Sequence, residues 1–179
     1  MHWLKYFIAR IVVKLTGNDE AICRYLRKTG MKIGENCHIY SDIFTGEGFL
    51  VEIGDNVTIS NGVQLITHDN SICKVLPEFS DTFGTVKIGS NSFIGAKTVI
   101  MRGVTIPPNT IIGAGSVVTR SFTEERTIIA GNPARVVGNW ENYAAKYADV
   151  AVNVTNVQGE EREALIRKSA ECLQSRNRP

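Results

Sequence analysis

The chain has 179 residues, the length of one domain, with 43% hydrophobic and 21% charged residues. The 20 Lys and Arg nearly balance the 18 Asp and Glu, and a net charge of +2 predicts no nucleic-acid partner. No segment reaches 18 consecutive apolar residues, and the four cysteines form no CxxC pair, so we expect no spanning helix, no cleaved signal peptide and reduced thiols in a cytoplasm.

An amphipathic helix is expected near the start of the chain. Apolar residues recur from Trp3 to Leu15 at helical spacing, and the basic residues off this stripe are Lys5, Arg10 and Lys14. The pattern favours a cap packed on the structure that follows. A basic helix that rests on a membrane surface remains the alternative.

A second helix follows, with Asn18 or Asp19 as its expected cap and an end near Gly30. The two helices make residues 1–30 a predicted N-terminal helical cap. His2 and His38 lie in or just after this part of the chain, and we interpret both as structural or solvated.

A period of six dominates the middle of the chain. An aliphatic residue occupies every sixth position from 88 onward: Ile88, Ile94, Ile100, Ile106, Ile112 and Val118. The same phase occurs upstream, at Ile53, Ile59 and Leu65, and more weakly at Ile33 and Ile39. Such a unit suits a short strand plus a turn, and three units make a triangular coil of 18 residues. Stacked coils would place Ile88 on Ile106, Ile94 on Ile112 and Ile100 on Val118.

Two irregularities interrupt the repeat. Residues 71–87 form a 17-residue excursion that begins just after His68 and Asp69, and two extra residues form a bulge near 45–49. Long loops in a compact domain are usually functional or disordered. The apolar residues of the excursion are expected to pack on a neighbouring subunit or to roof a site, with a floppy insertion as the alternative.

After Gly138 the repeat is lost. Residues 143–151 and 160–173 read as helices with charged outer faces, so 139–179 is a predicted C-terminal helical segment. Such segments cover the exposed edge of a solenoid.

The repeat over residues 31–138, together with the segments IIGAGSVVTR and IIAGNPARVVG, resembles the hexapeptide-repeat acyltransferases that use acetyl-CoA. The resemblance implies a mainly β fold, a left-handed parallel β-helix shaped as a triangular solenoid. It also implies a homotrimer and acetyl-CoA as co-substrate, with no metal.

His68 is the candidate general base. Position alone favours a structural corner histidine, but the segment LITHD matches the place where the resembled enzymes carry a catalytic histidine. An imidazole with a pKa near ~6.5 can take a proton from an attacking hydroxyl. Asp69, Glu78 and Asp81 are candidates to orient its ring, and the resemblance favours Glu78.

A column of small residues is the candidate donor site. Gly95-Ala96 and Gly113-Ala114 are 18 residues apart and would stack, leaving a groove for pantetheine, although turns alone also require small residues. The resemblance implies coenzyme A contacts at Ala96, Ala114, Thr119, Arg120 and Arg135, and the two arginines suit its phosphates. The chain departs from the pattern with Phe93 in place of a Trp and without a second basic residue near Gly138.

We therefore expect an O-acetyltransferase that acts on a sugar or surface-polysaccharide precursor, in the cytoplasm or at the inner face of the membrane. Another small hydroxyl or amine acceptor, including an antibiotic, and a non-catalytic β-helical scaffold remain alternatives.

A zinc hydrolase would need three convergent histidines, and only His68 lies in a regular coil. Cys73 could suggest transfer through a thiolate, but no basic neighbour supports this and a plain loop cysteine is favoured.

Overall fold

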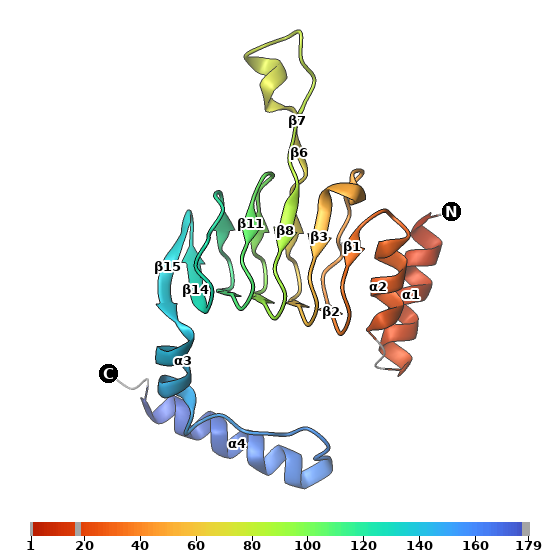
Figure 1. The fold of residues 1–179 in the computed structure, drawn as a ribbon. Helices are drawn as coiled ribbons and strands as arrows, with labels where there is room; N and C mark the ends of the chain where they lie inside the picture. The colour runs from red at the N-terminus through yellow and green to blue at the C-terminus, as the bar shows by residue number, and fades with distance from the viewer. Residues whose placement is uncertain (1, 17–18, 177–179) are drawn as a thin grey trace. The chain divides into compact units, whose positions relative to one another are not determined.

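The computed structural model describes residues 2–16 and 19–176, and the chain divides into two compact units that meet between Gly138 and Asn139. In the described part, no helix combines the length and apolarity needed to cross a membrane. The first unit begins with helices α1 (His2–Thr16) and α2 (Glu20–Arg27) and continues as a repetitive β structure (Figure 1).

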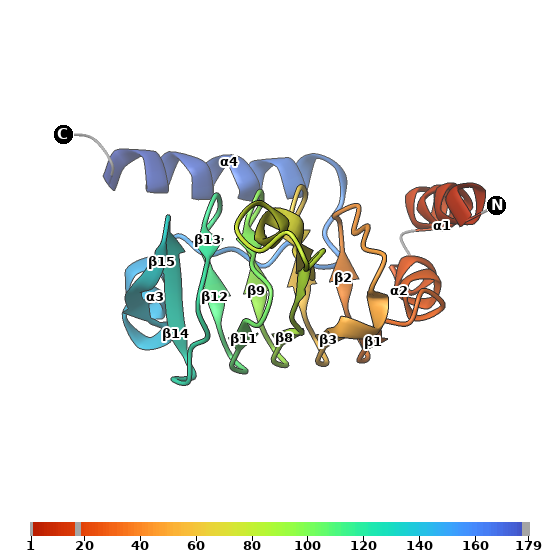
Figure 2. The same cartoon turned by 90° about the horizontal axis from the view of Figure 1, so that it is seen from above.

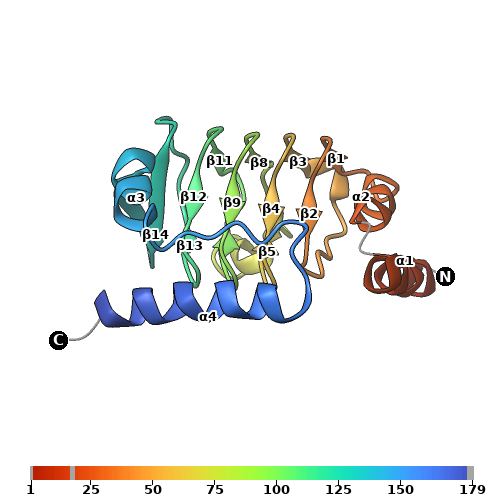
Figure 3. The ribbon, with the colours of Figure 1, turned by 90° about the horizontal axis from the view of Figure 1, so that it is seen from below.

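Three sheets make up this β structure, and their strands from β1 to β14 pair in parallel. The first sheet has the order β1-β3-β8-β11, formed by Lys32–Ile33, Val51–Ile53, Val86–Ile88 and Thr105–Ile106. The second has the order β2-β4-β9-β12-β14-β15, formed by His38–Ile39, Thr58–Ile59, Phe93–Ile94, Ile111–Ile112, Thr127–Gly131 and Ala134–Asn139. The third has the order β5-β10-β13, formed by Gln64–Leu65, Val99–Ile100 and Val117–Val118. From β3 to β13, apart from the strands of the excursion, successive strands enter the three sheets in turn, so each of these coils contributes one strand to each face (Figures 2 and 3).

The predicted stacking of hexapeptides is confirmed. Ile88 pairs with Ile106, Ile94 with Ile112 and Ile100 with Val118, always in parallel register. The preceding coil extends these three columns of stacked side chains. Its residues Ile53, Ile59 and Leu65 pair with Ile88, Ile94 and Ile100, respectively. All nine side chains are buried in a single hydrophobic core, which no coil could form alone.

One corner of the solenoid is built on asparagines. Asn56, Asn91 and Asn109 adopt positive φ, which Asn tolerates better than most residues. Their side chains form a ladder, with Asn56 donating to Asn91 and Asn91 donating to Asn109, each at 2.7 Å. The turn residue thus also links adjacent coils.

The bulge and the excursion also occur where the sequence places them. The register from β1 to β3 is 20 residues (Ile33 to Ile53), two more than a coil, and the extra residues lie in a corner that includes a 3₁₀ turn, η1 (Gly48–Leu50). The excursion is an antiparallel ribbon of β6 (His68–Asp69) and β7 (Thr82–Phe83) that projects from the solenoid, with a second 3₁₀ turn, η2 (Asn70–Lys74), beyond it (Figure 1). We call residues 70–81 the arm. The predicted boundary at residue 87 was two residues too late, because Val86 is buried and already pairs with Val51 in the solenoid.

The N-terminal helices cap the first coil through unexpected residues. In α2, the buried side chains are Ile22, Cys23 and Leu26. In α1, Tyr6 and Ala9 are buried, and Arg10 donates to the carbonyl of Ile39 at 2.9 Å. The predicted packing of the apolar stripe is therefore wrong, because the polar bonds of Tyr6 and Arg10 fix the helix with that stripe turned outward.

Asp19 is the N-cap residue of α2, as expected, and its carbonyl accepts from the Ile22 amide at 3.2 Å. Its carboxylate makes no capping bond and instead pairs with Nδ1 of His38. Asn18 and the side chains of His2, Trp3, Lys5 and Lys14 lie outside the described residues.

The second unit contains α3 (Trp140–Tyr147) and α4 (Gly159–Arg176). The predicted helix at 143–151 begins three residues earlier, because the Asn139 side chain accepts from the Asn142 amide at 2.9 Å and caps the helix there. Residues beyond Ala148 lie outside α3.

Candidate functional site

His68 lies three residues after β5, at the edge of the third sheet where the β6–β7 ribbon leaves the solenoid. Its Nδ1 is 2.8 Å from Oε2 of Glu47, a residue of the bulge in the preceding coil. The same Glu47 oxygen accepts from Thr67 at 2.8 Å and from Thr45 at 3.2 Å. Two threonines and the histidine thus hold one carboxylate in place.

This arrangement sets the tautomer of the ring. The bonds from Thr67 and His68 keep the pKa of Glu47 below its usual range, so the carboxylate is ionised at neutral pH and the pair is lost only as the pH falls through that lowered pKa. An ionised carboxylate can only accept, so Nδ1 must donate the proton. In the neutral ring, Nε2 then keeps its lone pair. The side chain of His68 is 48% exposed, so Nε2 can be reached from solvent.

The carboxylates that were expected from the sequence to orient the His68 ring do not hydrogen-bond to it. Asp69 pairs with Arg102 at 2.9 Å and accepts from the Ser71 amide at 2.8 Å, and the Ser71 bond, followed by Arg102, lowers its pKa. Glu78 is an exposed residue of the arm. The structure therefore corrects the expectation, because the carboxylate bonded to the His68 ring is Glu47 and not Glu78 or Asp69.

A cavity of about 640 Å³ opens beside His68. Aromatic and apolar side chains line much of it, including Tyr25, Phe44 and Met31, and Lys28 is its cation. Thr45, which holds Glu47, also faces this space. Sites of this kind bind small polar ligands through a few placed polar groups on an apolar wall.

The small residues of the predicted donor site line up at a different corner, before strands β10 and β13. Gly95 packs so closely on the next coil that a Cβ there would lie 2.5 Å from the Ala114 amide nitrogen, and at Gly113 it would lie 3.0 Å from the Ala130 Cβ. Ala96 and Ala114 belong to the same column, since the Gly115 amide donates to the Ala96 carbonyl at 2.8 Å. Close packing on the next coil thus explains why residue 95 is a glycine. Ala114, in contrast, is exposed and free to contact a ligand.

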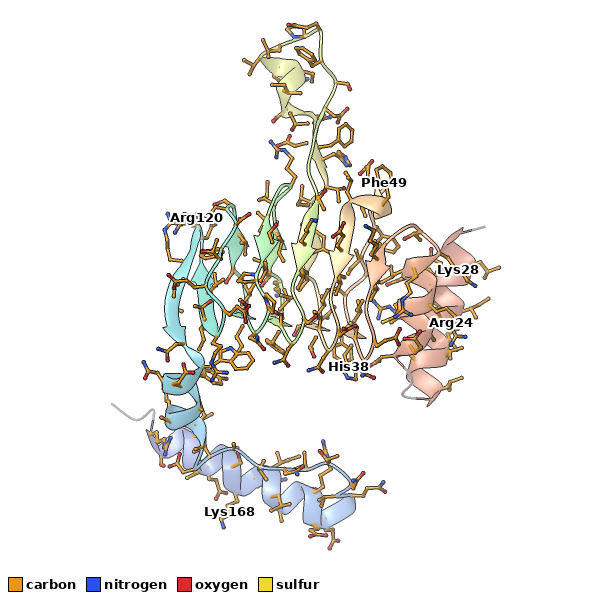
Figure 4. All side chains as sticks on the ribbon, viewed as in Figure 1. Arg24, Lys28, His38, Phe49, Arg120 and Lys168 are labelled. Carbon is orange, nitrogen blue, oxygen red and sulfur yellow. The ribbon has the colours of Figure 1, made fainter. Side chains whose placement is uncertain are left out.

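The predicted phosphate-binding residues are exposed as well. Thr119 and Arg120 directly follow β13, and the Arg120 guanidinium lies 5.5 Å from the centre of the Phe122 ring. Arg135 lies on β15 and donates to the carbonyl of Ala134 at 2.9 Å. Figure 4 shows Arg120 at the edge of the solenoid from which the arm projects.

Within one chain, His68 and the residues of the predicted donor site do not lie together at one place. His68 follows β5, and Arg120 follows β13, two strand spacings away or roughly 10 Å along the same edge. Ala96 and Ala114 precede their strands and so lie at the opposite edge of that sheet. Over residues 2–16 and 19–176, no group of three or more His, Cys, Asp or Glu side chains is placed to hold a metal.

Two family descriptions match the repeat. Residues 85–120 match the bacterial transferase hexapeptide (six repeats), and residues 48–66 match the hexapeptide repeat of succinyl-transferase. Both matches fall within the three-sheet region.

The chain is similar to several bacterial proteins. Protein CapG of Staphylococcus aureus is 40% identical over 132 residues, which cover 70% of this chain and 76% of CapG. A maltose O-acetyltransferase of Clostridium difficile 630 is 25% identical with a TM-score of 0.57, covering 77% of this chain and 87% of that one. A hexapeptide-repeat acetyltransferase of Vibrio cholerae, solved with acetyl coenzyme A, shares the fold at 19% identity and a TM-score of 0.59, covering 76% and 85% of the two chains.

Proposed function

Because this chain belongs to the family of bacterial hexapeptide-repeat transferases, we propose that it is an O-acetyltransferase that moves the acetyl group of acetyl-CoA to a hydroxyl of a sugar or surface-polysaccharide precursor. The observation that carries the proposal is the bond between His68 and Glu47 beside an open cavity. We further propose that the solenoid over residues 31–138 is the catalytic domain and that its coils run left-handed, as the family resemblance implies.

The acceptor hydroxyl gives its proton to Nε2 of His68 while its oxygen attacks the thioester carbonyl carbon. Glu47 stabilises the imidazolium that forms, because it accepts from Nδ1 and carries negative charge. The tetrahedral intermediate collapses, the carbon–sulfur bond breaks, and the imidazolium returns the proton to the departing thiolate. No covalent enzyme intermediate is required, so both substrates must be bound together.

The cavity beside His68 is the proposed acceptor site. Tyr25 and Phe44 offer aromatic faces to a sugar ring, and Lys28 offers a cation to an acidic group on the acceptor. The maltose O-acetyltransferase among the similar proteins supports a sugar acceptor. A small amine or an antibiotic is the alternative, and a panel of acceptors would separate these substrates.

The donor site is proposed to lie along the small-residue column, with Arg120 and Arg135 binding phosphates. Ala114 is exposed and small, which allows a thin pantetheine arm to approach the backbone. This column and His68 lie at opposite edges of one sheet, so we propose a homotrimer in which a neighbouring subunit brings the two together. Since acetyl-CoA is the donor, we place the reaction in the cytoplasm.

Titration calorimetry with acetyl-CoA tests the class of function. An acetyltransferase should bind the donor saturably, at one site per chain. A β-helical scaffold should give no binding heat, and that result would remove the proposal.

Replacing Glu47 with glutamine is expected to lower kcat by about 10- to 1,000-fold, because an amide can hold the ring in the wrong tautomer and does not stabilise the imidazolium. The Kd of acetyl-CoA should stay within twofold, since Glu47 lies away from the small-residue column. Steady-state kinetics and calorimetry on the same preparation provide the two readouts.

The matched control is Asp69→Asn, which makes the same chemical change one residue from His68. Asp69 pairs with Arg102 rather than with the ring, so kcat should fall by less than about threefold. Equal losses in the two variants would show that Glu47 has no special role.

The arm supplies the next prediction. Its apolar side chains Val75, Leu76 and Phe79 are exposed, and we propose that they form a wall of the acceptor site or pack on a neighbouring subunit. Replacing residues 72–81 with a short Gly/Ser linker keeps the β6–β7 ladder and every core column. We expect kcat/KM for the acceptor to fall at least about tenfold, or roughly 1.4 kcal/mol, while acetyl-CoA still binds. Unchanged acceptor kinetics in the folded variant would make the arm a dispensable insertion.

A further inference from the structure

The outer face of α1 carries an apolar stripe that the fold leaves uncovered. Its members are spaced four, three and four residues apart, so they lie on one side of the helix: Leu4, Ile8, Ile11 and Leu15. These four residues are 59%, 51%, 40% and 78% exposed. The opposite side of the helix, with Tyr6 and Ala9, already supplies the packing on the first coil. The stripe is therefore a surface available to a partner.

The two N-terminal helices are also basic. The sequence of residues 2–16 contains Lys5 and Lys14 and no Asp or Glu, and its third basic residue, Arg10, faces the first coil and pairs with Asp42. On α2, Arg24 and Lys28 are exposed, and among the described residues neither forms an ion pair (Figure 4). The nearest acidic groups are engaged elsewhere, since Glu20 pairs with Arg27 and Asp19 with His38. A partner for this face must be apolar and negatively charged.

A groove of about 310 Å³ joins the stripe to the cations. It lies between α1 and α2 and is lined by Ile8, Val12, Arg24, Tyr25 and Lys28 among others. Tyr25 and Lys28 also line the cavity beside His68. Whatever covers the groove therefore lies next to the proposed acceptor site.

We propose that the face formed by α1 and α2 binds the surface of a bilayer that contains anionic phospholipids. The stripe would insert between the acyl chains near the headgroups, and Arg24 would contact lipid phosphates, while Lys28, which lines both the groove and the cavity, stays available to the acceptor. A second copy of the same face would bring like charges together, which argues against self-association here. The inference goes beyond acetyl transfer, because it predicts that the enzyme meets its acceptor at a membrane.

Co-sedimentation with vesicles tests the proposal. The full chain should bind vesicles that mix phosphatidylcholine with phosphatidylglycerol, and it should bind pure phosphatidylcholine at least about tenfold more weakly. The double variant I8S/I11S should lose at least about tenfold in partitioning to the mixed vesicles, and R24E should lose binding to them as well. The matched control is V136S/V137S, which removes two other exposed valines from β15 and should bind as the wild type does.

Each other outcome has a defined meaning. Equal binding to both vesicle types, or an I8S/I11S variant that still binds the mixed vesicles, would overturn the proposal. So would a change in oligomeric state of I8S/I11S by sedimentation, because the stripe would then be a subunit contact. Acetyl-CoA binding of I8S/I11S should be unchanged, so failure of this inference can be told apart from failure of the proposed function.

Discussion

His68→Ala is expected to lower kcat by about 10²–10⁴-fold, the usual cost of removing a general base. The acceptor hydroxyl would then have no group to take its proton, and Glu47 would lose its partner. The Kd of acetyl-CoA should stay nearly unchanged, because the imidazole does not anchor the donor. Steady-state kinetics with acetyl-CoA and an accepted sugar, combined with calorimetry, separate the two quantities.

His38→Ala is the matched control. His38 also has a carboxylate partner, Asp19, and is half exposed, but Figure 4 shows it on the side of the solenoid opposite the arm. Its loss should change kcat by less than about threefold. A His68→Ala variant that keeps more than a third of the wild-type activity would contradict the assignment of the base.

Ala114→Trp should abolish acetyl-CoA binding. The residue is exposed at a corner of the last regular coil, and an indole there would occupy the space proposed for pantetheine without entering the core. Calorimetry should detect no saturable binding, while circular dichroism should match the wild type. Glu35→Trp adds the same ring at an exposed corner of the first coil, where the Glu35 side chain is 79% exposed, and should bind acetyl-CoA normally. Undiminished binding by Ala114→Trp would place the donor site elsewhere.

The two inactive variants together test the trimer. If His68 of one subunit works with the small-residue column of another, co-expressed His68→Ala and Ala114→Trp chains form some sites in which both parts are intact. Activity should then recover to a measurable fraction of the wild type. No recovery in a mixed trimer would mean that each chain holds a complete site.

The period of six made the solenoid predictable to the residue. Columns such as Ile94 on Ile112 follow from spacing alone, because only a stacked coil buries an aliphatic residue at every sixth position. His68, the proposed general base, was also selected from sequence, but the carboxylate bonded to its ring was not. The bulge at 45–49 was visible, yet nothing in the sequence shows that Glu47 reaches across a coil to His68, since that contact depends on how the corner folds.

The N-terminal helix shows a second limit. Its apolar stripe was correctly read from the spacing, but periodicity tells which residues share a face and not what covers that face. Tyr6 and Arg10 decide the orientation through bonds to Asp42 and to the carbonyls of Ile39 and Ser41. Those acceptors exist only once the first coil has formed, about 30 residues further along the chain.

The most direct test of the proposed activity is to incubate the wild type with acetyl-CoA and a panel of sugars and sugar-linked acceptors, and to measure both free thiol and product mass. We expect one acceptor class to gain a single acetyl group on a hydroxyl for each thiol released, and His68→Ala and Glu47→Gln to reduce both signals together. An enzyme that binds acetyl-CoA but acetylates no hydroxyl, or that releases thiol equally without any acceptor, would contradict the proposed activity.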